Sequence, residues 1–200
     1  MAQTTAAAGF LVGLLGESPN DTASLQALLG RRYGARVRFV VISPDITGAQ
    51  LDSPKFQHII RVNYRIKNPA VVVITRDLDA PATDRQQRLK RLLFFRKLNK
   101  GMELKAVFLL HVQAMEALIA ADVAVFNHRY QCACTVPADP TTIIDPARFL
   151  KNATPFGKPG YSEGHCASLL QEVRYEELLA KCSYFAAFDA DFARRLPALP

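Results

Sequence analysis

The chain has 200 residues, of which 50% are hydrophobic and 22% are charged, so it can bury the core of one ordinary domain, and general disorder is excluded. No stretch reaches the roughly 18 uninterrupted apolar residues of a membrane span, so we expect no membrane-spanning helix and no membrane partner. The apolar residues 6–16 lack a preceding Lys or Arg, so they predict a buried strand and not a secretory signal. Four cysteines without an export signal favour reduced thiols and a cytoplasmic protein.

Strand and helix patterns alternate in the first half of the chain. Short apolar or β-branched runs are typical of buried strands, and Ser18 followed by a proline is a typical helix start. The expected elements are strands at residues 9–16, 36–43 and 70–75, a helix that starts after Ser18, and a weak helix over residues 53–66.

The second half begins with a basic helix over residues 84–100 and a fourth strand over 104–111. Beyond it we expect a helical stretch at 113–130, a proline-rich irregular stretch at 131–160, and two or three short helices within 161–195. The alternation predicts an α/β fold: a mostly parallel, Rossmann-like sheet with helices on both faces and a helical C-terminal part. We expect a single domain over residues 1–200, with its core at about 8–130 and an extension at 131–200.

The positive charge is concentrated in the basic helix. Residues 84–100 hold seven Lys or Arg and one acid, which is +6 of the formal net charge of +7. Such an element is typical of proteins that contact phosphate-rich partners, and nucleic acid is the partner we expect. The alternative is a solvated amphipathic helix with an apolar stripe of leucines at 89, 92, 93 and 98. The candidate nucleic-acid contacts are Arg85, Arg88, Lys90, Arg91, Arg96 and Lys97.

Acidic residues follow two of the predicted strands. Glu17 follows the first strand, Asp21 comes one turn later, and Asp77 and Asp79 follow the third strand. The carboxyl ends of parallel strands meet at one sheet edge, and hard cations such as Mg²⁺ or Mn²⁺ prefer oxygen ligands there. Each acid also has a structural alternative: Asp21 can complete a capping box, Asp77 or Asp79 can cap the next helix, and Glu17 can lie in solvent.

The segments GLLGESPNDTASLQALL and VVVITRDLDA resemble the Toprim domain, the catalytic domain of topoisomerases, bacterial primases, recombination proteins and OLD-type nucleases. The resemblance implies that Glu17, Asp21, Asp77 and Asp79 bind metal, with Glu17, Asp77 and Asp79 also catalytic. Many Toprim domains have Glu-Gly at the first motif, whereas this chain has Gly16-Glu17-Ser18.

The later chain resembles small stand-alone Toprim-like proteins related to OLD nucleases. Glu116 in QAMEALIAAD matches an acid that begins the helix after the fourth strand, which implies a fifth metal ligand. The segment KPGYSEGHCASLLQEV matches a loop with Lys and Tyr, which implies Lys158, or alternatively Lys151, as the basic catalytic residue. The resemblance covers residues 10–190 in order and spacing. It also implies that an ATPase, in some relatives a separate chain, could act as partner.

Two function classes follow from these patterns. The first is a Mg²⁺- or Mn²⁺-dependent nuclease that cleaves phosphodiester bonds in DNA or RNA. The second is a non-catalytic Toprim-fold module that binds nucleic acid or protein, in which the acids are structural. A zinc site is the weaker interpretation, because Cys-x-Cys lacks the usual knuckle spacing. Its candidate ligands would be His128, Cys132, Cys134, His165 and Cys166.

Overall fold

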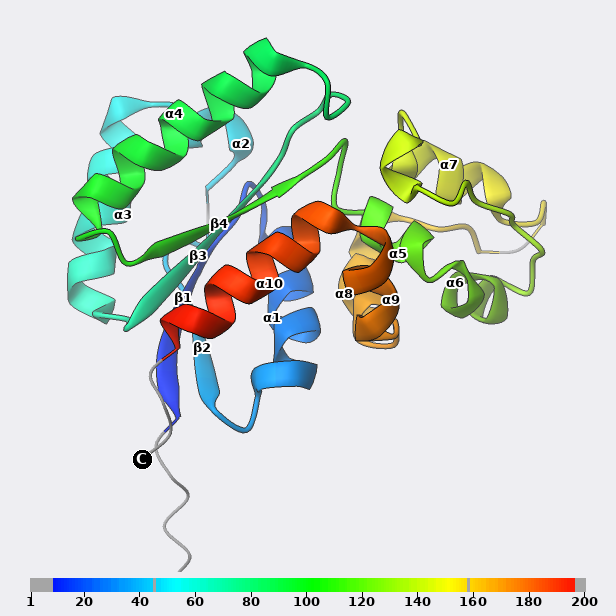
Figure 1. Ribbon diagram of the computed structural model, residues 1–200, viewed down its shortest axis with the longest axis horizontal. Helices are drawn as coiled ribbons and strands as arrows, with labels where there is room; N and C mark the ends of the chain where they lie inside the picture. Colours follow the sequence, from blue (N-terminus) through cyan, green and yellow to red (C-terminus); the bar gives the residue numbers. More distant parts are fainter. Residues whose placement is uncertain (1–8, 45, 158, 197–200) are drawn as a thin grey trace, which may run out of the picture.

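The computed structural model describes residues 9–44, 46–157 and 159–196. Four strands form one parallel sheet in the order β2-β1-β3-β4 (Figure 1). The α/β fold and the parallel sheet are therefore confirmed. The strands are β1 (Phe10–Leu15), β2 (Val37–Val41), β3 (Val71–Asp77) and β4 (Ala106–His111).

The order of the strands reverses around β1. Val12 on β1 is in register with Phe39 on β2 and with Val71 on β3, so the chain moves to one side of β1 and then returns to the other. In parallel α/β sheets, ligands bind beyond the carboxyl ends of the strands where the order reverses. Here that position is the loop after Leu15 together with the loop after Asp77.

Each face of the sheet has its own apolar core. Helices α1 (Pro19–Tyr33) and α10 (Ser183–Arg195) cover one face, and α3 (Pro54–Lys67) and α4 (Arg85–Gly101) cover the other (Figure 1). The short α2 (Gly48–Leu51) precedes α3. Because strand side chains alternate, Val71 and Val73 pack in the core on the α1 side, while Val72 and Ile74 pack on the α4 side.

The rest of the chain forms short helices at one end of the sheet (Figure 1). They are α5 (Ala117–Ala121), α6 (Val123–Tyr130), η1 (Pro140–Thr142), α7 (Pro146–Ala153), η2 (Glu163–His165), α8 (Cys166–Leu170) and α9 (Tyr175–Lys181). The helix expected at 113–130 is divided at Asp122, whose carboxylate accepts hydrogen bonds from Arg174. The stretch expected to be irregular contains α7, which Asp145 caps by accepting from the Arg148 N–H.

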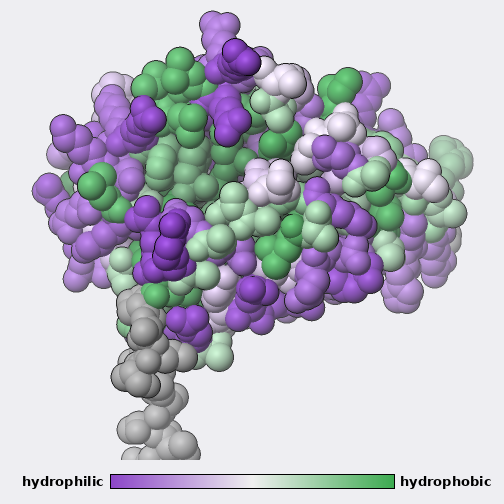
Figure 2. Space-filling view, in the orientation of Figure 1, coloured by the Kyte–Doolittle hydropathy of each residue, from purple (hydrophilic) through white to green (hydrophobic). Residues whose placement is uncertain are grey.

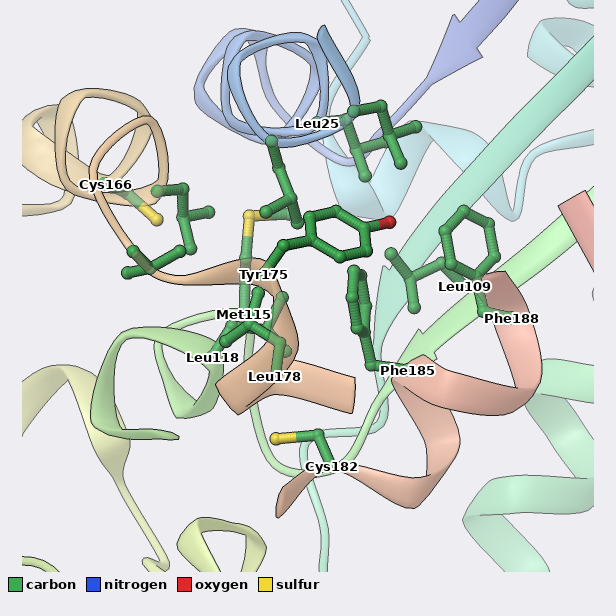
Figure 3. Close-up of a cluster of buried hydrophobic side chains, with 14 of the residues drawn as sticks. Leu25, Leu109, Met115, Leu118, Cys166, Tyr175, Leu178, Cys182, Phe185 and Phe188 are labelled. Carbon is green, nitrogen blue, oxygen red and sulfur yellow. The ribbon is translucent and has the colours of Figure 1, made fainter. Parts of the chain in front are cut away.

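The C-terminal helices belong to the main core. Figure 3 shows Tyr175 of α9 between Leu25 of α1 and Phe185 of α10, with Leu109 of β4 nearby. All four side chains are at most 5% exposed. The helices beyond residue 130 therefore stabilise the sheet directly, and they form part of the same folding unit as the strands.

Helix α4 turns a different face inward from the one that its leucines predict. Arg91, Phe94 and Leu98 are its buried residues, whereas Leu89 and Leu93 are 55% and 53% exposed. Next to it, an apolar groove of about 420 Å³ runs between α4 and α10 along the edge strand β4. Figure 2 shows this green, recessed area among hydrophilic side chains. Among the described helices, none combines the length and apolar character needed to cross a membrane.

Candidate active site

Three of the predicted acids line one pocket at the carboxyl edge of the sheet. Asp21 comes from α1, Asp77 from the end of β3, and Glu116 from the residue before α5. Glu163 of η2 joins them, and the pocket has a volume of about 170 Å³. We call it the acidic pocket; the other described residues that line it are Ser18, Asn20, Ser24, Ala114, Met115, Ala147 and Cys166.

Asp21 is fixed in the acidic pocket by a capping box. Its Oδ2 accepts hydrogen bonds from the backbone N–H groups of Glu17, at 2.7 Å, and Ser18, at 3.0 Å. The Ser18 hydroxyl in turn accepts from the Asp21 N–H at 3.2 Å. A Cβ at Gly16 would lie 2.7 Å from the Asp21 Cβ, so this close approach requires glycine before Glu17. The structural and the functional interpretations of Asp21 are thus compatible.

Asp77 is half-buried at the carboxyl end of β3. Burial raises the pKa of Asp77 well above its ordinary value, and the neighbouring carboxylates of Asp21 and Glu116 raise it further. Among the described residues, none donates a hydrogen bond to its carboxylate. Asp77 is therefore a carboxylate that a bound cation would stabilise strongly.

Glu116 is 8% exposed and accepts a hydrogen bond from the hydroxyl of Tyr161 at 3.1 Å. Burial raises the pKa of Glu116. Glu163 was missed by the sequence analysis, although it lies in the segment KPGYSEGHCASLLQEV. No local pattern distinguishes it from a helix-capping acid, because its approach to Asp21 and Glu116 depends on how η2 packs.

Glu17 has a different environment. Its carboxylate forms a close ion pair with Arg76, and the Nη1 of Arg91 lies 3.9 Å from its Oε1. Burial raises the pKa of Glu17, and the positive charge of Arg76 offsets part of that effect. Glu17 is thus neutralised inside the protein, and it does not line the acidic pocket.

Asp79 is also paired with an arginine. Its Oδ2 accepts from the Nη2 of Arg91 at 2.5 Å, and the backbone of Asp79 has a φ of 55° where the chain turns away from β3. Arg76 additionally binds Asp52 at 2.8 Å. We call Glu17, Asp52, Arg76, Asp79 and Arg91 the arginine cluster.

The alternation of side chains along β3 separates the acidic pocket from the arginine cluster. Asp77 points to the same side of the sheet as Val71 and Val73, which is the side of α1. Arg76 points to the same side as Ile74, which is the side of α4. The guanidinium of Arg76 stacks over the ring of Phe94, 4.5 Å from its centroid, on the α4 side. The five predicted acids therefore fall into two groups, and they do not form a single five-ligand site.

The acidic pocket fits a divalent cation by the chemistry of its donors. Carboxylate oxygens are the ligands that Mg²⁺ and Mn²⁺ prefer. The Oδ1 of Asp21, which among the described residues accepts only from the Ser18 hydroxyl, retains a lone pair for such an ion. Within residues 9–44, 46–157 and 159–196, no three His, Cys, Asp or Glu side chains are close enough to coordinate one ion as they stand. Binding would thus require a rearrangement of the carboxylates that line the acidic pocket.

Five of the six basic residues predicted to contact nucleic acid are exposed on α4, namely Arg85, Arg88, Lys90, Arg96 and Lys97. The sixth, Arg91, is 6% exposed and is held by Asp79, so its guanidinium faces the protein. Lys158 lies outside the described residues. Lys151 is exposed on α7 and lines a groove of about 740 Å³, which shares Ala147 and Glu163 with the acidic pocket.

Three of the candidate zinc ligands, Cys132, Cys134 and His165, have other hydrogen-bond partners. The ring Nδ1 of His165 lies 2.8 Å from the hydroxyl of Tyr130, and the thiol of Cys132 donates to Asn127. Burial raises the pKa of Cys166 to about 12, so this thiol stays protonated beside the acidic pocket. His111 is fully buried next to Thr75, and burial lowers its pKa to about 3, which keeps its ring neutral.

The chain was compared with family models, with curated proteins and with solved structures, and no match was found in any of the three.

Proposed function

We propose that the protein is a divalent-metal-dependent nuclease that cleaves phosphodiester bonds in DNA or RNA. The observation that carries this proposal is the acidic pocket. Asp21, Asp77 and Glu116 come from three separate elements and reach the same small pocket at the edge where parallel sheets bind ligands. The raised pKa of Asp77 supports the proposal, because strongly shifted carboxyl groups in clefts are typical of functional sites.

In this proposal Asp77, Asp21 and Glu116 hold Mg²⁺ or Mn²⁺, and Glu163 lies at the rim. Such an ion lowers the pKa of a bound water and stabilises the negative charge that develops on phosphate. Tyr161 orients Glu116 through its hydroxyl, and the capping box orients Asp21. The chain therefore fixes two of the three carboxylates before any ligand is present.

Positive residues on either side of the acidic pocket would bind the substrate. Lys151 on α7 lines the adjoining groove and can neutralise a phosphate there. On α4, the exposed residues Arg85 and Arg88 lie in its first turns, just beyond the loop that follows β3. The resemblance to Toprim-like proteins adds Lys158 as a further basic residue and an ATPase as a partner.

The second candidate function is a non-catalytic module that binds nucleic acid or protein. The observation that favours it is the arginine cluster, because Arg76 and Arg91 already neutralise Glu17 and Asp79, two residues that the Toprim resemblance implies to be catalytic. In such a module the exposed charges of α4 would bind the partner and the acidic pocket would have no chemical role.

A cleavage assay separates the two functions. Plasmid DNA, single-stranded DNA and RNA are incubated with the full chain in Mg²⁺, in Mn²⁺ and in EDTA. We expect cleavage that requires the metal and that falls at least about 100-fold in Asp77→Asn. The matched control is Glu103→Gln, which removes an exposed carboxylate from the loop before β4 and should leave the rate unchanged.

Thermal unfolding of both variants checks that each one is folded. Cleavage that is equally fast in EDTA, or that survives in a folded Asp77→Asn variant, contradicts the proposed site. Binding of nucleic acid without cleavage under every condition supports the non-catalytic module.

A further inference from the structure

Arg76 is a buried cation with an unusual set of partners. It lies on β3 directly before Asp77 and is 3% exposed. Its guanidinium pairs with Glu17 from the loop after β1 and with Asp52 from the end of α2, and it stacks over Phe94 of α4. A planar guanidinium with five donors suits this arrangement, because it can bind two carboxylates and an aromatic ring at once.

Arg91 completes the charge balance of the arginine cluster. It contacts both Glu17 and Asp79, so two arginines face the three carboxylates of Glu17, Asp52 and Asp79. The residual charge of this cluster is one negative unit. The acidic pocket, by contrast, has four carboxylates and no Lys or Arg among its described lining residues. Of these two groups, only the acidic pocket therefore has strong repulsion between carboxylates that an added cation would reduce.

Glu17 cannot serve both groups. To coordinate an ion in the acidic pocket, its carboxylate would have to leave Arg76, with which it forms a close ion pair. That movement would leave the guanidinium of Arg76 buried with half of its charge partners, which is strongly unfavourable. Asp79 would likewise have to leave Arg91.

We propose that Arg76 is a resident cation between Glu17 and Asp52, so that the arginine cluster binds no divalent ion and this protein binds a single divalent ion, in the acidic pocket. This inference rests on the proposed function. Arg76 and Arg91 are positioning residues, because they hold Glu17 and Asp79 in fixed places beside the acidic pocket. Their positive charges belong to the chain itself, so they cannot dissociate as a bound metal ion can.

The stoichiometry of Mn²⁺ binding tests this inference without any assay of activity. The full chain is stripped with EDTA, dialysed, and titrated with Mn²⁺ while free Mn²⁺ is followed by electron paramagnetic resonance. We expect one ion per chain. Asp77→Asn should weaken binding at least about 100-fold, because it removes a direct ligand. Glu17→Gln should leave the affinity within about threefold, because the charge that it removes lies outside the coordination sphere and acts through screened electrostatics.

Two bound ions in the wild type, with one of them lost in Glu17→Gln, would overturn the single-ion inference and leave the proposed function intact. Failure of the wild type to bind Mn²⁺ would instead remove the proposed function itself. A further variant, Arg76→Gln, leaves Asp52 without its counter-ion and Glu17 with only the longer contact to Arg91, and we expect it to bind a second, weaker Mn²⁺ ion. A folded Arg76→Gln variant that still binds one ion would also overturn the inference.

If Arg76→Gln does not fold, Arg91→Gln tests the inference from the rim of the cluster. It frees Asp79 and removes the longer contact to Glu17 while Arg76 stays in place. Because the resident cation remains, we expect this variant to keep one ion per chain. A second ion in Arg91→Gln would mean that Arg76 alone does not keep a divalent ion out of the arginine cluster, and it would contradict the inference.

Discussion

On one face of β3, Asp77 lies among other carboxylates in the acidic pocket, whereas on the opposite face Arg76 pairs with Glu17 and Asp52 in the arginine cluster. Both groups occupy the carboxyl edge of one sheet, and adjacent residues of one strand supply their central charges. The arginine cluster is already satisfied by its own chain, while the acidic pocket stores repulsion that an external cation would relieve. Acids at one sheet edge can therefore have opposite roles, and the face of the sheet to which each side chain points decides which role it takes.

The largest expected effect concerns the core that supports the acidic pocket. Phe185 of α10 is fully buried against Tyr175 and Phe188, so Phe185→Ala should lower the free energy of unfolding by about 3–5 kcal/mol. Leu93→Ala on the exposed side of α4 is the matched control and should change it by less than about 0.5 kcal/mol. Urea unfolding of both variants measures the difference. Equal losses would mean that α10 does not share a core with the sheet.

A smaller effect is expected from the repulsion in the acidic pocket. The pKa of Asp77 is raised in the folded protein, so the folded state binds its proton more tightly than the unfolded state does. Stability contributed by this proton is present at low pH and is lost as pH rises above the unfolded-state pKa of about 3.9. In EDTA at pH 7, Asp77→Asn should therefore raise the melting temperature by a few degrees, and the gain should disappear as the pH falls toward 4.

Asp79→Asn is the matched control for this measurement. It removes the partner of Arg91 and should lower the melting temperature or leave it unchanged. Differential scanning calorimetry between pH 4 and pH 8 records both variants. A melting temperature that falls in Asp77→Asn at pH 7 would show that this carboxylate stabilises the apoprotein, and that the acidic pocket holds no repulsion for a cation to relieve.

Two arginines on α4 should differ in their contribution to DNA binding. Arg88 is exposed and Arg91 is buried against Asp79, so only Arg88 is free to contact a phosphate. Arg88→Gln should reduce the slope of log K against log salt by about 0.9 for duplex DNA, and Arg91→Gln should leave that slope unchanged. Fluorescence anisotropy with a labelled duplex at several salt concentrations measures both. The same loss of slope in Arg91→Gln would mean that Arg91 leaves Asp79 when DNA binds.

The smallest effect is expected at the start of α1. Ser18→Ala removes the hydroxyl that accepts from the Asp21 N–H, and it should lower the free energy of unfolding by about 1 kcal/mol or less. The Asp21 carboxylate keeps its backbone donors, so Mn²⁺ affinity should change little. Urea unfolding and Mn²⁺ titration of one sample measure both quantities. A large loss of Mn²⁺ affinity would mean that the Ser18 hydroxyl itself belongs to the binding site.

The amino-acid sequence by itself determined the fold class, the four strands, and the edge at which the acids gather. These features depend on local patterns: apolar runs for buried strands, the Ser18 cap for α1, and acids directly after β1 and β3. It also predicted that Asp21 and Asp77 lie close together, from their positions at strand ends, and the Toprim resemblance added Glu116. The same prediction placed Glu17 and Asp79 in that site, and these two do not line the pocket.

Only the tertiary structure decided how the acids divide between two sites. No sequence pattern distinguished Arg76, and Arg91 was expected to contact phosphate; the roles of both depend on which way β3 and α4 face when packed. Glu163 reaches the acidic pocket from 86 residues beyond Asp77 because η2 and α8 pack against α1. Such long-range pairings arise from the packing of whole elements, and no local pattern of residues encodes them.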